Sequence, residues 1–437
     1  MSDNESKIPT HRLSRIGQFA SLATRIGGNV VAEGTKQWLK GQRPQTKELL
    51  LTPSNIKRVA DQLAHLRGAA MKVGQMLSMD SGDLLSPELA EILARLRSDA
   101  NPMLSKQLNG VLEQGLGSDW KQHFLSFNFK PVASASIGQV HQAYTDDGDN
   151  VAVKVQYPGI RNSIDSDVNN VATLLNLVGI IPKDIDVKSL LDEAKKQLHA
   201  EANYQLECQY LTRYKKHLSD RSYFIVPNAY PNLSSETVLT MEFIEGDSIE
   251  SLVTAPQTLR DQVMHNLLEL LFAELFEFQL VQTDPNFANY LYNQQLNKIV
   301  LLDFGATREY SDIISMGYRK AFSAAIKNDD QALEAALTQI GFFSQSIVES
   351  QKLAILDLVK LACEPMCHQG AYDFGQSDLA NKVRQRGSAL SLQENYWHTP
   401  PIDAIFLHRK IGGLYLLAAR LKARIDIQSL VMPYIKM

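Results

Sequence analysis

Apolar side chains in the first 120 residues recur at helical spacing. Arginines between positions 12 and 25 alternate with apolar residues, which predicts a basic amphipathic helix. Such a helix docks on a partner, lies on an anionic membrane surface or packs on its own domain. From Val59 to Leu77 the apolar residues alternate between spacings of four and three, which predicts a helix with a narrow packing seam. A second helical segment is predicted from 87 to 116.

The pattern then changes to that of strands and turns. Residues 131–156 predict two antiparallel strands joined by a tight turn at an Asp-Asp-Gly-Asp segment. Residues 187–217 predict one long polar helix, and two apolar strands are expected at 223–226 and 237–244. From Asp247 onward the pattern predicts mostly helices, apart from the hairpin that carries Asp303. Strands first and helices afterwards predict a bilobal α+β protein.

Composition narrows the class of protein. The chain has 437 residues, 44% of them hydrophobic, which suits two or three globular domains. The net charge of −4 gives no reason to expect nucleic-acid binding, although residues 1–60 carry an excess of Lys and Arg. Three cysteines and the lack of a signal-peptide pattern favour the cytoplasm. No apolar run approaches the about 20 residues that span a bilayer.

Candidate chemistry lies around the predicted hairpin. Asp284 is followed five positions later by Asn289, and Asp303-Phe304-Gly305 follows an apolar strand. Kinase-fold proteins use this spacing to place a carboxylate near a nucleophile and two oxygen ligands on Mg²⁺. Asp284 is therefore predicted to orient a hydroxyl or water, and Asn289 and Asp303 to bind the metal. A second Asp-Phe-Gly at 373–375 lacks the preceding strand and predicts a polar turn.

The predicted strands supply groups that suit ATP. Lys154, in a Val-Ala-Val-Lys context, is predicted to hold the α- and β-phosphates, with Glu207 as its partner. The two charges require each other, since burying either alone costs several kcal/mol. Backbone groups of Glu242 and Ile244 are predicted to meet the adenine edge.

The expected phosphate loop departs from that of protein kinases. It carries Ala133, Ala135 and Gly138 in place of three glycines, and no Ala-Pro-Glu motif follows Asp303. With five motifs in order, the chain resembles the UbiB-type atypical kinases, or AarF-domain kinases, from about residue 55 to 430. The motifs are Lys72-Val-Gly-Gln75, the alanine-rich segment 133–141, Val151-Ala-Val-Lys154-Val-Gln-Tyr-Pro-Gly, Gln282-Thr-Asp284-Pro-Asn and Asp303-Phe-Gly305.

The resemblance implies a kinase-like fold with an added N-terminal helical element and a mostly helical C-lobe. Lys72 and Gln75 of that element would fold over the active site and take the place of a peptide substrate. The alternative for Lys72 is an ordinary solvated lysine. The resemblance also assigns nucleotide contacts to the loop residues Ala133, Ser134, Ala135 and Ser136. The expected domains are 1–50 (basic segment), 51–120 (helical extension), 121–245 (N-lobe) and 246–437 (C-lobe).

One position departs from the family pattern. The family's Glu-x-Asp pair falls on Glu201 and Asn203, so the second carboxylate is an amide here. An amide can accept a hydrogen bond but cannot neutralise Lys72. On a single helix, Glu201 and Glu207 point about 120° away from sharing a face, whereas Asn203 lies on Glu207's side.

The function implied by the resemblance is ATP hydrolysis or atypical phosphotransfer with Mg²⁺ and ATP, in support of ubiquinone or other isoprenoid-lipid metabolism. Expected partners are an anionic membrane surface, an isoprenoid lipid or quinone precursor and a biosynthetic enzyme complex. The protein would lie peripherally on the inner face of a membrane. Whether it forms a homodimer is left open by the sequence. Alternatives are a nucleotide-binding pseudokinase scaffold and a kinase of small molecules or proteins.

Overall fold

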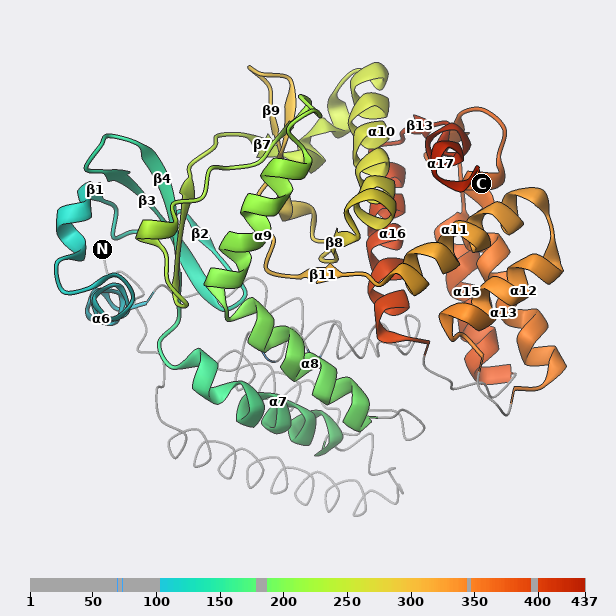
Figure 1. The fold of residues 1–437 in the computed structure, drawn as a ribbon, viewed down its shortest axis with the longest axis horizontal. Coiled ribbons are helices and arrows are strands. Elements are labelled where there is room, and N and C mark those ends of the chain that lie inside the picture. The colour runs from blue at the N-terminus through green and yellow to red at the C-terminus, as the bar shows by residue number, and fades with distance from the viewer. Residues whose placement is uncertain are drawn as a thin grey trace, which may run out of the picture. The chain divides into compact units, whose positions relative to one another are not determined.

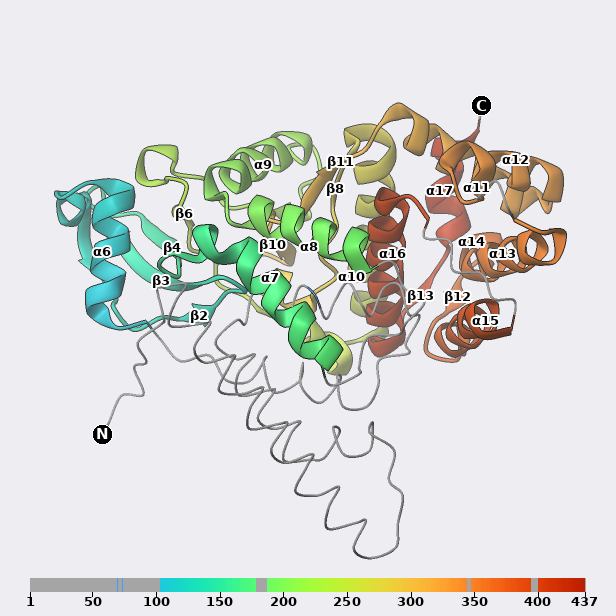
Figure 2. The ribbon, with the colours of Figure 1, turned by 90° about the horizontal axis from the view of Figure 1, so that it is seen from below.

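The computed structural model describes residues 103–177, 187–343, 347–393 and 400–436, together with Ala69 and Val73 (Figures 1 and 2). These residues belong to two compact units. The first comprises the described chain up to Cys208 and Ala229–Phe243, and the second comprises Gln209–Asn228 and Ile244 onward. Residues 209–228, which the sequence analysis placed in the N-lobe, therefore group with the second unit. The predicted basic helix, Lys72 and Gln75 lie outside the described residues.

The first unit is built on an antiparallel sheet in the order β1-β3-β4-β6, with β2 paired to β3. Its strands are β1 (Phe124–Phe127), β2 (Ala133–Ser134), β3 (Gly138–Thr145), β4 (Asn150–Gln156) and β6 (Val238–Glu242). Strands β3 and β4 form the predicted hairpin, and their turn is closed by a hydrogen bond from the Thr145 amide to the Asp149 carbonyl. The two-strand prediction for residues 131–156 is thus confirmed.

Alternation along β4 decides where Lys154 points. Val151, Val153 and Val155 are fully buried in one apolar cluster with Leu112 of helix α6 (Ser105–Leu116) and Trp120, which lies in the 3-10 turn η1 (Trp120–His123). Successive side chains of a strand point to opposite faces. Lys154 therefore lies on the face of β4 opposite these valines.

The predicted long helix at 187–217 is wrong in one respect, because the structure has two helices there. Helix α8 ends at Glu201 and α9 begins at Tyr204, so α8 is Val187–Glu201 and α9 is Tyr204–His217. The Asn203 side-chain oxygen accepts a hydrogen bond from the Leu206 amide, an N-cap interaction that starts the second helix. Helix α7 (Ile160–Leu177) packs along α8. The periodicity was helical on both sides of the break, so it did not reveal the break.

The second unit is mostly helical, as predicted. Its longer helices are α10 (Gln257–Ala273), α11 (Asp312–Lys327), α12 (Asp330–Ile340), α13 (Glu349–Ala362), α15 (Leu379–Gln393), α16 (Ile402–Arg420) and α17 (Ile427–Ile435), with the short α14 (Glu364–Cys367) and the 3-10 turns η3 (Ile249–Thr254) and η5 (Phe287–Asn289). The 3-10 turn η2 (Pro231–Leu233) belongs to the first unit. Helices α10 and α16 lie side by side (Figures 1 and 2). Among the described residues, no helix is long and apolar enough to cross a membrane. The α+β prediction is confirmed.

Strands in the second unit carry the predicted chemistry. Hairpin strands β9 (Tyr290–Asn293) and β10 (Lys298–Leu301) join β5 (Phe224–Ile225) and β7 (Asp247–Ser248) in one sheet. A separate pair is formed by β8 (Leu280–Gln282) and β11 (Thr307–Glu309), and another by β12 (Tyr372–Asp373) and β13 (Arg424–Ile425). Helix α10 continues into a π-turn at Glu274–Phe278, which ends at Gln279 in the left-handed region and leads into β8.

Candidate functional site

In the first unit the structure brings together the predicted Lys154 and Glu207. The Lys154 ammonium donates to both carboxylate oxygens of Glu207, at 2.9 and 3.0 Å, and the two residues are 7% and 2% exposed. The same ammonium lies 5.0 Å from the ring centre of Tyr204, which begins α9. Because the ammonium binds both oxygens of one buried carboxylate, the position of the lysine is fixed, as a phosphate-binding role would require.

The alanine-rich segment forms a tight connection between β2 and β3. Ala133 and Ser134 lie in β2 and are exposed, and the Ala135 amide donates to the Gly138 carbonyl. A Cβ atom on Gly138 would lie 2.3 Å from the Val155 carbonyl oxygen, so a side chain cannot be accommodated there. The backbone of this loop can therefore approach β4 closely, which is what a phosphate loop needs.

Glu201 and Asn203 belong to different helices, so the predicted angle between Glu201 and Glu207, which assumed a single helix, is wrong. The prediction that Asn203 lies on Glu207's side is not contradicted, because the Glu207 amide donates to the Asn203 carbonyl. Glu201 ends α8, where its carboxylate lies 3.5 Å from the Ser136 hydroxyl of the alanine-rich loop. Asn203 caps α9 instead. Sequence reasoning missed the cap, although Asn is among the residues that favour this position.

Glu242 is the last residue of β6, where it pairs with Val151. The next amide, of Phe243, donates to the Asn150 carbonyl and continues the ladder by one residue. Ile244 begins the longer of the two stretches that make up the second unit. The adenine contacts expected of Glu242 and Ile244 stay predictions.

In the second unit, three hydrogen bonds join the Asp284 loop to the Asp303 loop. The Thr283 amide and hydroxyl both donate to the Ala306 carbonyl, at 3.1 and 2.7 Å. The Leu302 amide donates to the Asn289 carbonyl at 3.1 Å. These bonds flank Asp284, Asn289 and Asp303, so the three residues lie near the open end of the β9–β10 hairpin.

Asp284 is held from two directions. The Asn289 amide nitrogen donates to its carboxylate at 3.0 Å, and the Arg409 guanidinium of α16 lies 3.6 Å away. Because a carboxylate accepts but does not donate, the Asn289 nitrogen must face Asp284 and its oxygen must face elsewhere. Sequence reasoning missed Arg409, which lies 125 positions from Asp284 and carries no local motif.

The two Asp-Phe-Gly triplets have the same local turn but different surroundings. Gly305 and Gly375 each donate an amide hydrogen bond of 2.9 Å to the aspartate two residues earlier. The turn predicted after Asp373 is confirmed at residues 374–376. Asp373 itself binds Arg424 in the β12–β13 pair. Phe304 is buried against Tyr214, with ring centres 4.7 Å apart.

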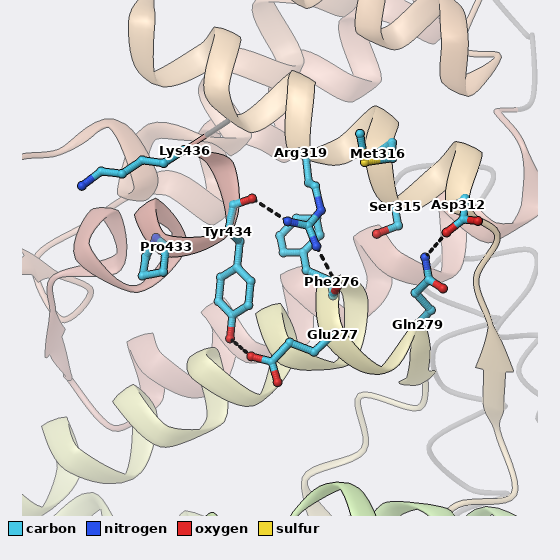
Figure 3. Close-up of a pocket in the computed structure, with 10 residues that line it drawn as sticks. All are labelled: Phe276, Glu277, Gln279, Asp312, Ser315, Met316, Arg319, Pro433, Tyr434 and Lys436. Carbon is cyan, nitrogen blue, oxygen red and sulfur yellow. Dashed lines mark hydrogen bonds between the residues drawn. The ribbon is translucent and has the colours of Figure 1, made fainter.

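A cavity of about 440 Å³ also lies in the second unit, and none of the predicted site residues lines it (Figure 3). Several of its polar groups already have hydrogen-bond partners within the protein. Arg319 donates to the carbonyls of Phe276 and Tyr434, and the Tyr434 hydroxyl donates to Glu277 (Figure 3). Because Arg319 and Glu277 already have these partners, the cavity is a poor candidate for the chemistry.

Comparison with known proteins identifies the family. Residues 95–337 match the ABC1 atypical kinase-like domain. The chain belongs to this family of atypical kinases. It is 36% identical to the mitochondrial atypical kinase COQ8 of Saccharomyces cerevisiae over 97% of this chain and 85% of that protein. It is also 36% identical to the mitochondrial COQ8B of Rattus norvegicus, over 98% of this chain and 81% of the relative.

A solved structure supports the fold. The Rv3197 protein of Mycobacterium tuberculosis, solved in complex with erythromycin, has a TM-score of 0.59 to this ABC1 family chain and 25% identity, covering 87% of this chain and 97% of that one. These similarities confirm the predicted UbiB-type family, the kinase-like fold and an ATPase or phosphotransferase of the atypical kinase type. They also support the predicted place in ubiquinone biosynthesis.

Proposed function

We propose that this ABC1 family protein is an ATPase that uses Mg²⁺ and ATP and needs no protein acceptor. The observation that carries the proposal is the buried Lys154–Glu207 ion pair, with its two short hydrogen bonds. A buried ion pair is weak evidence for stability, since apolar residues of the same size often serve a fold equally well. A lysine fixed in this way suits the charge neutralisation that phosphoryl transfer requires.

The residues of the first unit would bind the nucleotide. Lys154 would neutralise the α- and β-phosphates, and backbone amides of the loop from Ala133 to Ser136 would lie along the phosphate chain. The side chains in that loop are small, which lets the backbone approach closely. The backbone of Glu242 and Ile244 would bind the adenine.

The donor set of the second unit fits Mg²⁺. Asp303 supplies a carboxylate and Asn289 an amide oxygen, and Mg²⁺ prefers hard oxygen ligands of this kind. The Asn289 nitrogen is committed to Asp284, which directs its oxygen away from that carboxylate. When bound, the ion would neutralise charge on the phosphates. Asp284, held by Asn289 and Arg409, would orient the attacking water or hydroxyl.

Two further parts of the proposal concern the N-terminal region. Lys72 and Gln75 would close over the nucleotide and restrict protein substrates, as the family resemblance implies. The basic segment of residues 1–50 would bind an anionic membrane surface close to an isoprenoid lipid or quinone precursor, where several Lys and Arg contribute about 1 kcal/mol each. Salt-sensitive co-sedimentation with anionic but not neutral vesicles, lost on deleting residues 10–40, would support this part. Equal binding to both vesicle types would oppose it.

The test of the metal site uses the two Asp-Phe-Gly triplets as variant and control. Asp303→Asn should lose the stabilisation that Mg²⁺ and ATP together give the wild type, because an amide replaces a charged ligand. Asp373→Asn, in the matched turn, should keep it. The readouts are the thermal shift with Mg²⁺ and ATP and the release of phosphate without an acceptor.

Equal thermal shifts in wild type and Asp303→Asn would remove Asp303 from the metal site. Nucleotide binding without any phosphate release, with or without small-molecule acceptors, would favour the pseudokinase scaffold. Phosphate transfer only in the presence of an acceptor would favour a kinase.

A further inference from the structure

A second buried ion pair lies in the second unit, outside the residues assigned to nucleotide and metal. Glu274, in the π-turn after α10, and Lys410, in the middle of α16, are each 1% exposed, and their charged atoms lie 3.7 Å apart. Burial opposes the charge of the Lys410 ammonium, but Glu274 and Tyr290 raise its pKa above the ordinary value. A charged lysine so deep in the protein needs a reason other than stability.

The hydrogen bonds of Lys410 point to that reason. Its ammonium donates to the Gln282 side-chain oxygen at 3.0 Å and to the Tyr290 hydroxyl at 2.7 Å. Gln282 precedes Asp284 by two residues, and Tyr290 directly follows Asn289. One buried ammonium therefore holds both ends of the segment that carries the proposed base and one proposed metal ligand.

Glu274 links Lys410 to the segment of Asp303, the second proposed metal ligand. Its carboxylate accepts a hydrogen bond from the Gln282 amide at 3.3 Å and lies 2.8 Å from the Tyr214 hydroxyl. The Tyr214 ring packs against Phe304, the residue after Asp303. We call Lys410, Glu274, Gln282, Tyr290 and Tyr214 the Lys410 network. It contacts all three segments of the proposed phosphoryl-transfer site in this unit.

Helix α16, which carries Lys410, is also packed tightly against the Asp284 loop. A Cβ atom on Gly413 would lie 2.3 Å from the Cβ of Pro285, the residue after Asp284. Arg409, the neighbour of Lys410, approaches Asp284 itself. The position of α16 is therefore transmitted to Asp284 by packing as well as by charge.

From these contacts we propose that Lys410, with Glu274 as its counter-ion, is a positioning residue that fixes Asp284 and Asn289 for turnover. The inference rests on the proposed ATPase function. Lys410 touches neither nucleotide nor metal in this scheme, and acts through Gln282 and Tyr290. A displacement of about 1 Å in such a site can lower a rate about 100-fold.

The variants are Lys410→Met, Glu274→Gln and the milder Tyr290→Phe, which removes only the hydroxyl that accepts from Lys410. Lys327→Met, an exposed lysine at the end of α11, is the matched control. We expect kcat for ATP to fall about 10- to 100-fold in Lys410→Met and Glu274→Gln, with KM and nucleotide affinity changed less than about threefold. The kcat of Tyr290→Phe should fall less, and the kcat of Lys327→Met should equal that of the wild type.

A second readout needs no turnover. Hydrogen exchange should accelerate in Lys410→Met at the amides of Thr283 and Leu302, which donate the bonds between the two loops, and at the Asn289 amide, which donates to the Asn286 carbonyl. Helix α12 of the same unit should keep its wild-type exchange. If the wild type releases no phosphate from ATP, the ATPase proposal fails by itself, and exchange still decides the role of Lys410.

Unchanged exchange at the three amides would overturn the positioning role. So would equal acceleration in α12, because Lys410 would then serve only the stability of the whole unit. A kcat that stays at the wild-type value in folded Glu274→Gln and Tyr290→Phe would overturn it as well.

Discussion

Replacing Lys154 by Met removes the ammonium that donates to both oxygens of Glu207 in a site where Glu207 is 2% exposed. A buried carboxylate that has lost its counter-charge can escape the penalty by binding a proton. The loss of stability is therefore capped by the free energy of protonating a glutamate. At pH 7 this is about 4 kcal/mol, from an ordinary pKa of about 4.3 and about 1.4 kcal/mol for each pH unit.

The same reasoning fixes how the loss depends on pH. At pH 5 protonation costs only about 1 kcal/mol, so the deficit of Lys154→Met relative to wild type should shrink from about 4 to about 1 kcal/mol. Glu207→Gln leaves a buried ammonium instead, and acidification should not relieve its deficit. The double variant, which buries no charge at this pair, should recover at least half of the loss at pH 7.

Hydrogen exchange at the amides of β3, β4 and β6, corrected for the intrinsic rate at each pH, measures the opening free energy of the first unit. A Lys154→Met deficit that is the same at pH 5 and pH 7 would refute the reasoning. So would a deficit below about 0.5 kcal/mol at pH 7, the range of ordinary surface changes.

Three further predictions concern individual side chains. Burial lowers the pKa of His408 to about 4, so below about pH 6.5 the unfolded chain binds a proton that the folded chain does not. The free energy of unfolding should therefore fall by about 3 kcal/mol as the pH drops from about 6.5 to about 4. Urea titrations should show a smaller fall in His408→Gln. Asn203→Ala should lower the free energy of unfolding in urea by about 1 kcal/mol, whereas Asn203→Asp should keep the stability and the cap. Altered ATP affinity in Asn203→Asp would instead support a role of residue 203 in holding Lys72. Gly413→Ala should lower the turnover of ATP and the free energy of unfolding, the latter by about 1–3 kcal/mol, because the new Cβ meets Pro285. Gly412→Ala, whose Cβ would have nothing within 4 Å, should be neutral or stabilising. Equal thermal melts of the two variants would contradict the packing argument.

The sequence by itself determined the family and the local placement of the candidate site. Alternation along β4 sets Lys154 opposite its buried valines, and the spacing of Asp284 and Asn289 fits the short loop before β9. These features depend on residues close together in the chain, whose periodicity and turn preferences are local. The function of residues 72 and 75 still rests on the motif alone, since they lie outside the described structure.

Tertiary structure decided what each charged group touches. The two Asp-Phe-Gly turns share one local geometry, and only their neighbours separate the candidate ligand Asp303 from Asp373. The bond from Lys410 to Gln282 joins residues 128 positions apart, and no local pattern announces it. Contacts of this range form only when helix α16 packs against the segment from Gln282 to Tyr290. Which residues meet was therefore fixed by the packing of distant apolar faces, and one sequence read along its length does not display that packing.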